Sequence, residues 1–418
     1  MNIKEMTKGI HDCVCGKDHN CPIDHVEIGV GVLPKIVDIC QDYENILLVA
    51  DQNTYRVCGQ EVQNLLGGKV AELVLFQTGD KPLIPDEEAL SAIQAKVSAK
   101  TQLIVGVGSG VINDLCKQIS FDNKLPYYIV ATAPSMDGYA SVGAALILKG
   151  MKVTTTAHSP KAILADAKVL KNAPMDMLQA GFGDIVGKYS CLNGWKLSAL
   201  INGEYICQRV YDIVYETAQR VEKLAEGVKN RDEQAVCALM DALVIVGIAM
   251  AYVNNSRPAS GSEHHLSHFF EITGILDNTP YFSHGIDVIY SAVVTAAIRE
   301  KLLSVTPHPY QHDQAAWDNE IEKIYSTSAE EVKKLQAKLN WYNTADFENV
   351  IAKWEQIKNI LVEAPNEEAM LKMVDSVGLN YKEFVDLYSQ QKIDNAVLYA
   401  KDLKDRYSVL WLNYMFCR

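Results

Sequence analysis

The feature that most constrains the fold is a change of hydrophobic pattern near residue 172. Between residues 24 and 166, short apolar runs such as residues 45–52 (NILLVADQ) alternate with helical segments such as residues 85–100. Strands and helices in repetition predict a parallel sheet covered by helices on both faces. Farther along, apolar residues recur with the 3.6-residue period of amphipathic helices, as in residues 208–227, and almost no strand signal remains.

We therefore expect an α/β fold with two domains. A Rossmann-like parallel-sheet domain would occupy residues 1–171, and an all-helical, metal-binding domain would occupy residues 172–418. The boundary falls near Pro174, because proline suits the first turn of a helix. The chain has 418 residues, 48% of them hydrophobic, which is enough for two hydrophobic cores.

Net charge and hydropathy limit the kinds of molecule that this chain is expected to bind. A net charge of −13 and the lack of a dense Lys/Arg run argue against nucleic acid or an anionic membrane, and favour a small-molecule substrate. The longest apolar stretch, residues 242–253, is about a dozen residues long, whereas a membrane-spanning helix needs about 20, so we expect a buried helix. The N-terminus has no apolar signal region and the ten cysteines are scattered, which predicts a cytoplasmic protein.

One group of cysteines is denser than the rest. Cys13, Cys15, His19 and Cys21 lie within a short N-terminal segment. Thiols and an imidazole together can bind zinc structurally, but the spacing CxC is unusual for a zinc knuckle and no second CxxC pair follows. A hairpin with reduced cysteines is the favoured interpretation, with a structural zinc site as the alternative.

Three ligand-type side chains stand out in the helical half. Asp184, His264 and His284 each lie in a Gly- or Ser-flanked segment, and together they can hold one divalent cation with a coordination position left for a substrate oxygen. We expect Asp184 near the start of a helix, with Lys188 one turn later on the same face. His268 lies one turn after His264 on the same helical face.

A glycine-rich turn is placed where a dinucleotide could bind. Residues 101–120 are typical of a strand, a turn with Gly106, Gly108 and Gly110, and a helix whose N-terminus offers free N–H donors to a pyrophosphate. The motif is not GxGxxG, and a purely structural turn is an equal alternative. Asp51 ends an apolar strand, where a carboxylate can accept hydrogen bonds from an adenosine ribose and favour NAD over NADP, or can simply cap a helix.

The segment that follows the next predicted strand is rich in hydroxyl groups. Residues 132–141 (TAPSMDGYAS) would lie at the carboxyl end of that strand, the edge at which open α/β sheets bind ligands. We favour contacts with the nicotinamide ribose or carboxamide over the alternative of a polar loop built from turn-forming residues.

Taken in order, these motifs resemble the glycerol-1-phosphate dehydrogenases of the bacterial NAD-dependent type. That family shares a superfamily with glycerol dehydrogenases, iron-containing alcohol dehydrogenases and dehydroquinate synthases. The resemblance covers about residues 25 to 290, and the tail AKDLKDRYSVLWL is similar to the ending of bacterial members. The motifs are GxGSGxxND, TAPSMDGYAS, SPKAILAD, AGFGDIVGK, SRPASGSEHxxSH and SHG.

The resemblance implies roles for residues of this chain. Asp184, His264 and His284 would bind the metal, and Asp137, Asp184 and His268 would face the substrate. Lys188 stands where the iron-containing enzymes usually have a fourth ligand, a histidine, which indicates a three-ligand site; zinc is the expected metal, and nickel also suits this donor set. The family also implies a homodimer. NAD would contact Gly108, Ser109, Gly110, Val111, Ile112, Asn113, Asp114, Thr132, Ala133, Pro134, Ser135 and Ser141.

The resulting hypothesis is reversible hydride transfer between NAD(H) and C2 of dihydroxyacetone phosphate or glycerol 1-phosphate. The metal would polarise the C2 oxygen, His268 could relay a proton, and Asp137 could hold a substrate hydroxyl. Arg257 and Lys188 are candidates for the phosphate by charge. The alternatives are a glycerol or other polyol dehydrogenase, a dehydroquinate-synthase-like cyclase, and a binding module with a structural metal.

Overall fold

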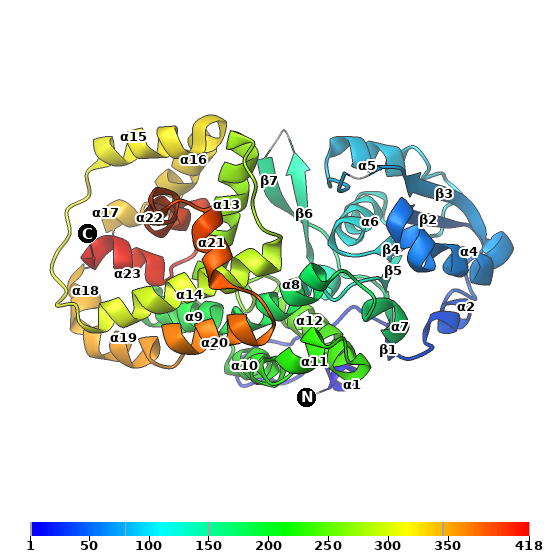
Figure 1. The fold of residues 1–418 in the computed structure, drawn as a ribbon, viewed down its shortest axis with the longest axis horizontal. Helices are drawn as coiled ribbons and strands as arrows, with labels where there is room; N and C mark the ends of the chain where they lie inside the picture. Colours follow the sequence, from blue (N-terminus) through cyan, green and yellow to red (C-terminus); the bar gives the residue numbers. More distant parts are fainter. Residues whose placement is uncertain (1, 80, 149–150, 345–346, 418) are drawn as a thin grey trace. The chain divides into compact units, whose positions relative to one another are not determined.

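A six-stranded parallel sheet organises the N-terminal part of the chain (Figure 1). The computed structural model describes residues 2–79, 81–148, 151–344 and 347–417. Across the sheet the strand order is β1-β8-β5-β4-β2-β3, and every neighbouring pair is parallel, as the sequence predicts. The strands are β1 (His25–Gly29), β2 (Ile46–Asp51), β3 (Val70–Phe76), β4 (Leu103–Gly108), β5 (Tyr127–Ala131) and β8 (Ala162–Asp166).

The central strands are buried on both faces, and for that reason they are nearly continuous apolar runs. Every residue of β4 and β5 is buried. On one face, Val105 and Val107 share a core with Ile36 of α2 and Val62 of α4. Because side chains alternate along a strand, the other face of β4 is the one on which α6 packs. The helices are α2 (Ile36–Ile39), α3 (Gln52–Thr54), α4 (Gln60–Leu66), α5 (Glu87–Gln94) and α6 (Gly110–Asn123).

Three of the observed strands are not among those that the sequence patterns predict. β8 lies between β1 and β5 in the sheet, and β6 (Gly143–Leu148) pairs with β7 (Met151–Thr156) as an antiparallel hairpin. A five-residue apolar run such as that of β8 cannot be told from a short buried helix by periodicity alone. Its strand character depends on the neighbours with which it pairs.

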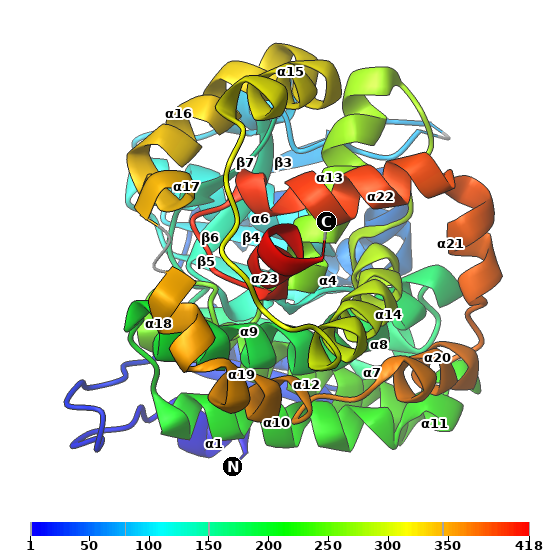
Figure 2. The same ribbon diagram turned by 90° about the vertical axis from the view of Figure 1, so that its left-hand side faces the viewer.

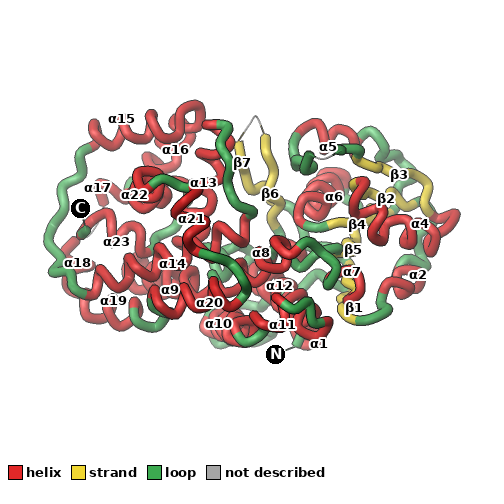
Figure 3. Tube along the Cα trace, in the orientation of Figure 1, coloured by secondary structure: helices red, strands yellow, loops and turns green. Residues whose placement is uncertain are grey.

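Contacts divide the chain into two compact units. The first comprises Met1–Ile185 with Gln219–Ser256, and the second comprises Val186–Ala218 with Arg257–Arg418. In the described residues all strands belong to the first unit, and β8 is the last of them, so the predicted change to helical structure near residue 172 is confirmed (Figure 3). Residues 172–185 and 219–256 group with the sheet, whereas the sequence assigns them to the helical domain; the domain boundary itself stays a prediction.

Helix α12 (Glu233–Val253) is the apolar core helix of the first unit. Within the described residues it is the one helix long and apolar enough to cross a membrane, with a mean hydropathy of 2.3, but 72% of that window is buried inside the protein. It packs against α1 (Ile3–Met6), α7 (Ala167–Leu170), α11 (Ala225–Lys229) and the short 3-10 helix η4 (Asp137–Ala140). A helix that is apolar on all sides belongs in a protein core, so the predicted buried helix is present and extends over 21 residues.

The second unit is a group of helices, in which α14 (His284–Leu303) can be followed in Figure 2. Most residues of α14 are buried. It packs against α13 (Ser262–Asp277), α20 (Glu367–Ser376) and α23 (Val409–Phe416). Helix α8 (Met175–Val186) begins directly after Pro174, as predicted. The boundary between the two units falls within α8 and again within α10 (Gln208–Glu222). The other helices are α9 (Lys188–Asn202), α15 (Gln314–Tyr325), α16 (Ala329–Leu339), α17 (Trp341–Thr344), α18 (Phe347–Ala352), α19 (Trp354–Leu361), α21 (Tyr381–Leu387) and α22 (Gln390–Tyr399).

Candidate metal and cofactor site

Asp184 is a buried carboxylate in the last turn of α8. It is fully shielded from solvent, and its Oδ2 accepts a hydrogen bond of 2.9 Å from the backbone N–H of Asp137. The expectation that it lies near the start of a helix with Lys188 on the same face is wrong, because α8 ends at Val186 and α9 begins at Lys188. The amphipathic pattern of α8 already starts at Met175, so Asp184 comes at its end. Lys188 is itself fully buried.

Two glycines allow the segment 132–141 to lie in close contact with α8 and α12. A Cβ at Gly181 of α8 would lie 1.8 Å from the carbonyl oxygen of Pro134, and a Cβ at Gly247 of α12 would lie 2.8 Å from that of Asp137. No side chain larger than hydrogen fits either contact without a shift of backbone. This close packing brings Asp137 to Asp184, so two of the residues predicted to face a substrate are neighbours.

Three histidines lie together at the N-terminal ends of α13 and α14. The ring centroids of His264 and His284 are 5.0 Å apart, and that of His268 is 6.2 Å from His264 and 5.6 Å from His284. His264 is buried, whereas His268 and His284 are partly exposed. Both helices begin where the sequence predicts, so the three predicted imidazoles are close in space.

Glu263 is a functional candidate that the sequence reasoning missed. Its Oε1 accepts hydrogen bonds from Nδ1 of His264 at 2.7 Å and from the N–H of Gly261 at 2.9 Å, and the carboxylate is fully buried. A carboxylate on Nδ1 sets the imidazole tautomer and leaves Nε2 as the ligand atom, which is the arrangement typical of metal-binding histidines. An acidic residue directly before a candidate histidine ligand was the signal available in the sequence.

Asp184 in the first unit, and His264 and His284 in the second, are the three predicted metal ligands. One carboxylate and two imidazoles are a donor set that suits zinc and other divalent transition metals, and three protein ligands leave room for a further oxygen.

The glycine turn serves helix packing. A Cβ at Gly108 would lie 2.5 Å from Cβ of Ile112, and one at Gly106 would lie 2.9 Å from Sγ of Cys116, both on α6. These two glycines therefore let α6 lie against β4, which is the structural alternative weighed from the sequence. Ser109 is the N-terminal cap residue of α6. The first amides of this helix therefore lie at the carboxyl end of β4, where the sequence predicts a bound phosphate.

Buried polar groups on α6 hold the hydroxyl-rich segment in place. Nζ of Lys117 donates to the carbonyl oxygens of Gly138 at 2.7 Å and Gly143 at 2.9 Å, and to Oγ of Ser141 at 3.1 Å. Burial lowers the pKa of Lys117, while the nearby carboxylate of Asp114 opposes that shift. Burial likewise raises the pKa of Asp114, whose Oδ2 accepts from the N–H of Ala145. Lys117 is a positioning residue that no sequence motif indicated.

Asp51 lies at the carboxyl end of β2 and acts as a helix cap. Its Oδ1 accepts hydrogen bonds from the N–H groups of Asn53 at 2.8 Å and Thr54 at 2.9 Å, at the start of α3. This is the capping role weighed as its alternative. A contact with a ribose stays a prediction.

Cations gather around the N-terminus of α13. Ser260 accepts from Nζ of Lys404 at 3.3 Å through Oγ and from Nη1 of Arg406 at 2.8 Å through its carbonyl. Burial lowers the pKa of His265 well below its usual value, and Lys404, Arg406 and Arg257 lower it further. Burial also lowers the pKa of Arg406 to about 10.

Arg257, a phosphate candidate from the sequence, has structural partners. Its Nε lies 3.0 Å from Oε1 of Glu204, and its Nη2 donates to the carbonyl oxygens of Gly194 and Tyr407. These contacts argue against a free role in phosphate binding.

The contact at Gly181 predicts a large effect of one methyl group. Helix propensity alone would make Gly181→Ala stabilising by about 1 kcal/mol, but the overlap with a backbone carbonyl should reverse the sign and destabilise by about 1–3 kcal/mol. The midpoint of urea unfolding measures this change. Gly68→Ala is the matched control, because no atom lies within 4 Å of a Cβ built there. Equal midpoints for both variants would contradict the close contact.

The chain is similar to proteins of known families. Residues 27–174 match a family described as iron-containing alcohol dehydrogenase. The chain is 31% identical over 327 residues to glycerol-1-phosphate dehydrogenase (NAD(P)+) of Halalkalibacterium halodurans, covering 77% of this chain and 82% of that one. It is 33% identical over 287 residues to the protein of the same name from Bacillus subtilis, covering 67% and 72%.

Solved structures show the same fold. A probable glycerol dehydrogenase from Sinorhizobium meliloti superposes with a TM-score of 0.61 at 14% identity, over 93% of this chain and 91% of that one. Sulfoacetaldehyde reductase from Bifidobacterium kashiwanohense, solved with NAD+, gives a TM-score of 0.61 at 15% identity over 93% of both chains. With its ordered motifs and its parallel sheet followed by helices, the chain belongs to the glycerol-1-phosphate dehydrogenase family, among the iron-containing alcohol dehydrogenases.

Proposed function

We propose that this chain is an NAD-dependent sn-glycerol-1-phosphate dehydrogenase, which transfers hydride reversibly between NAD(H) and C2 of dihydroxyacetone phosphate. The observation that carries the proposal is the pair of imidazoles of His264 and His284, whose ring centroids are 5.0 Å apart, with His264 held by Glu263, in a chain of this family. Family membership supports the reaction class. The paired imidazoles support a metal-assisted reaction at an alcohol or carbonyl carbon.

The residues present fit a divalent metal. The donor atoms are a carboxylate oxygen and two imidazole nitrogens, and Glu263 fixes the tautomer of His264. When bound, the metal would polarise the C2 oxygen of the substrate and lower the energy of the alkoxide that develops there. Zinc is the proposed metal, and nickel satisfies the same ligands.

Asp137 and His268 are the proposed catalytic groups. Asp137 is held at Asp184 through its backbone N–H, so its side chain is positioned to accept a hydrogen bond from a substrate hydroxyl. His268 is partly exposed beside the other two imidazoles, which suits a group that exchanges a proton between the substrate oxygen and solvent.

The proposed cofactor site uses the β4–α6 turn and the segment after β5. Oδ1 of Asn113 is a buried acceptor without a hydrogen-bond partner in the described part of the chain, and a bound amide or hydroxyl would satisfy it. The first amides of α6 have no carbonyl partners within the helix and suit a pyrophosphate. Asp51, at the carboxyl end of β2, is the proposed acceptor for an adenosine ribose, which favours NAD over NADP. The proposed contacts are Gly108–Asp114, Thr132–Ser135 and Ser141.

For the substrate phosphate we favour Lys404 and Arg406 over Arg257. Both lie at Ser260, just ahead of α13, where the helix N-terminus adds a partial positive charge. A homodimer and a cytoplasmic location remain predictions.

The test of the function is an assay of the purified, metal-loaded protein with NADH and dihydroxyacetone phosphate. We expect turnover that a chelator abolishes and that added zinc or nickel restores, with sn-glycerol 1-phosphate as the product in chiral analysis. Equal efficiency with dihydroxyacetone would favour a polyol dehydrogenase. Failure to accumulate NADH from glycerol 1-phosphate would favour a cyclase that uses NAD only transiently.

Glu263→Gln tests the positioning of the proposed ligand His264. A neutral amide cannot hold the Nδ1 proton as strongly, so we expect metal affinity to fall by about 10- to 100-fold. Asp277→Asn is the matched control, because it removes an exposed carboxylate from the same helix. Metal affinity is read by competition with a chromogenic chelator, and unchanged affinity in Glu263→Gln would contradict the role.

Lys404→Gln tests the phosphate proposal. Loss of a charge-assisted contact should lower kcat/KM for dihydroxyacetone phosphate by about tenfold or more and leave that for dihydroxyacetone unchanged. Lys338→Gln, at an exposed position on α16, is the control for loss of one positive charge. A loss shared equally by both substrates would show that Lys404 acts on something other than the phosphate.

A further inference from the structure

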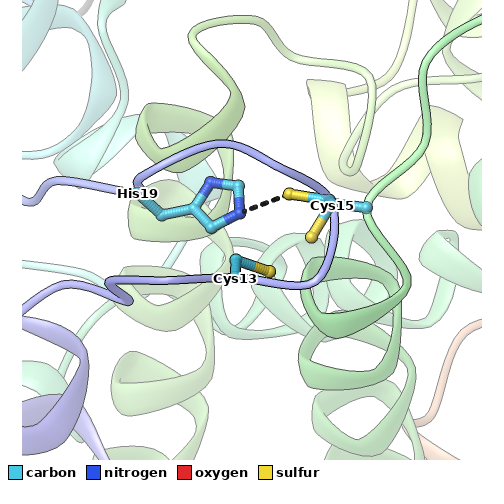
Figure 4. A group of neighbouring side chains, drawn as sticks. Cys13, Cys15 and His19 are labelled. Atoms are coloured by element: carbon cyan, nitrogen blue, oxygen red, sulfur yellow. Dashed lines mark hydrogen bonds between the residues drawn. The ribbon is translucent and has the colours of Figure 1, made fainter.

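A loop near the N-terminus brings metal-ligand side chains together within the first unit. Ile10 and His19 exchange backbone hydrogen bonds of 2.8 and 2.9 Å, which close the segment between them into a loop, residues 10–19. The side chains of Cys13, Cys15 and His19 point toward one another inside this loop (Figure 4). All of these residues belong to the first unit, so their spacing is a property of that unit by itself.

The two thiols and the imidazole are close enough to share one cation. One ligand atom from each of Cys13, Cys15 and His19 lies within 4.8 Å of the ligand atoms of the other two. Nε2 of His19 lies 3.3 Å from Sγ of Cys15. Bonds of about 2.0–2.3 Å to a tetrahedral zinc ion place neighbouring donor atoms about 3.3–3.8 Å apart. Small side-chain rotations therefore suffice to bring the three atoms to bonding distance of one ion.

The tautomer of His19 suits a metal ligand. Its side chain is fully buried, and Nδ1 lies 2.9 Å from the carbonyl oxygen of Tyr252 at the end of α12. Because a carbonyl can only accept, Nδ1 carries the proton and Nε2 presents its lone pair toward the thiols. A backbone carbonyl that fixes the tautomer in this way is a common outer partner of a ligating histidine.

The acceptor that orients His19 belongs to the core of the first unit. Tyr252 is buried on α12, its hydroxyl donates to the carbonyl of Met6, and its ring centroid is 5.6 Å from that of His19. The orientation of the imidazole is therefore set by packing against the core helix and does not depend on the loop.

The loop has little apolar core of its own. Residues 11–18 are each exposed or partly exposed, and the side chain of Val14 is 97% exposed. Asp12 and Gly16 have φ angles of +53° and +79°, in the left-handed region. Ordering such a backbone costs conformational entropy, and burial of apolar surface offsets little of that cost here. A cation bound between the turn and the buried histidine would supply the missing cross-link.

Cys21 lies outside this group, although the sequence places it with the other two cysteines. Burial raises the pKa of the Cys21 thiol, which disfavours the thiolate that a metal ion binds. Cys21 is also partly exposed and comes from the same segment. It is therefore the matched control for substitutions of Cys13 and Cys15.

We propose that the first unit binds one thiophilic divalent cation, such as zinc, through Cys13, Cys15 and His19. This site shares no residue with the proposed catalytic ligands and goes beyond the proposed function. On binding, each thiol releases its proton as a metal–sulfur bond forms, the imidazole bonds through Nε2 and keeps its Nδ1 proton, and no electron is transferred. A further donor completes the tetrahedral shell that zinc prefers.

Cobalt substitution of the full chain tests for sulfur ligands. Thiolates give cobalt(II) an intense near-ultraviolet charge-transfer band, whereas a site of one carboxylate and two imidazoles gives none. We expect the band in the wild-type protein and its loss in Cys13→Ser and in Cys15→Ser. It should persist in Cys21→Ser, and also in His264→Ala, which removes a proposed ligand of the catalytic metal only.

Metal analysis of the zinc-loaded proteins gives a second readout. Cys13→Ser and Cys15→Ser should each hold about one equivalent fewer than the wild type, and Cys21→Ser the same amount. The proposal is overturned by a wild-type protein without the band, or by a band that Cys21→Ser loses equally. A protein that has the band but no dehydrogenase activity would count against the proposed function and still support this site.

A third measurement uses only the wild-type protein, so it does not depend on whether the serine variants fold. The zinc-loaded chain is alkylated with and without prior chelation, and the modified cysteines are identified by mass spectrometry. We expect Cys13 and Cys15 to react only after chelation, with the reactivity of Cys21 unchanged. Equal reactivity of Cys13 and Cys15 in both samples would contradict metal ligation.

Discussion

The approach of α8 to the segment after β5 is the constraint on which the candidate site depends. At Gly181 the helix backbone lies so near the carbonyl of Pro134 that a Cβ would be 1.8 Å from its oxygen. Because of that approach, the N–H of Asp137 reaches the carboxylate of Asp184 at 2.9 Å. The proposed metal ligand and the hydroxyl-rich segment are therefore one packed structure, and Gly247 and Lys117 hold that segment from its other sides.

The predicted ligands Asp184, His264 and His284 offer borderline oxygen and nitrogen donors, which suit zinc and other divalent transition metals. Three protein ligands leave a coordination position that a substrate oxygen can complete. Nδ1 of His264 is held by the carboxylate of Glu263, which leaves Nε2 as the ligand atom.

Much of the fold and part of the site could be predicted from the chain alone. Alternating apolar runs predict the parallel sheet, and helix starts at Ser262 and His284 follow from local patterns. The position of Asp184 within its helix was predicted wrongly, because hydrophobic periodicity locates a helix more accurately than it locates the ends of that helix. Glu263 and Lys117 were missed because their roles depend on hydrogen bonds to partners that no spacing rule identifies.

The sequence by itself determined the kinds of donor atom, the alternation of strands and helices that gives way to helices alone, and the family to which the motifs belong. Tertiary structure decided which of these residues are neighbours. Gly106 and Gly108 face α6, and Gly181 of α8 lies against the carbonyl of Pro134. The physical reason is that local patterns depend on the few neighbouring residues in one element, whereas ligand groups and close backbone contacts depend on how distant elements pack.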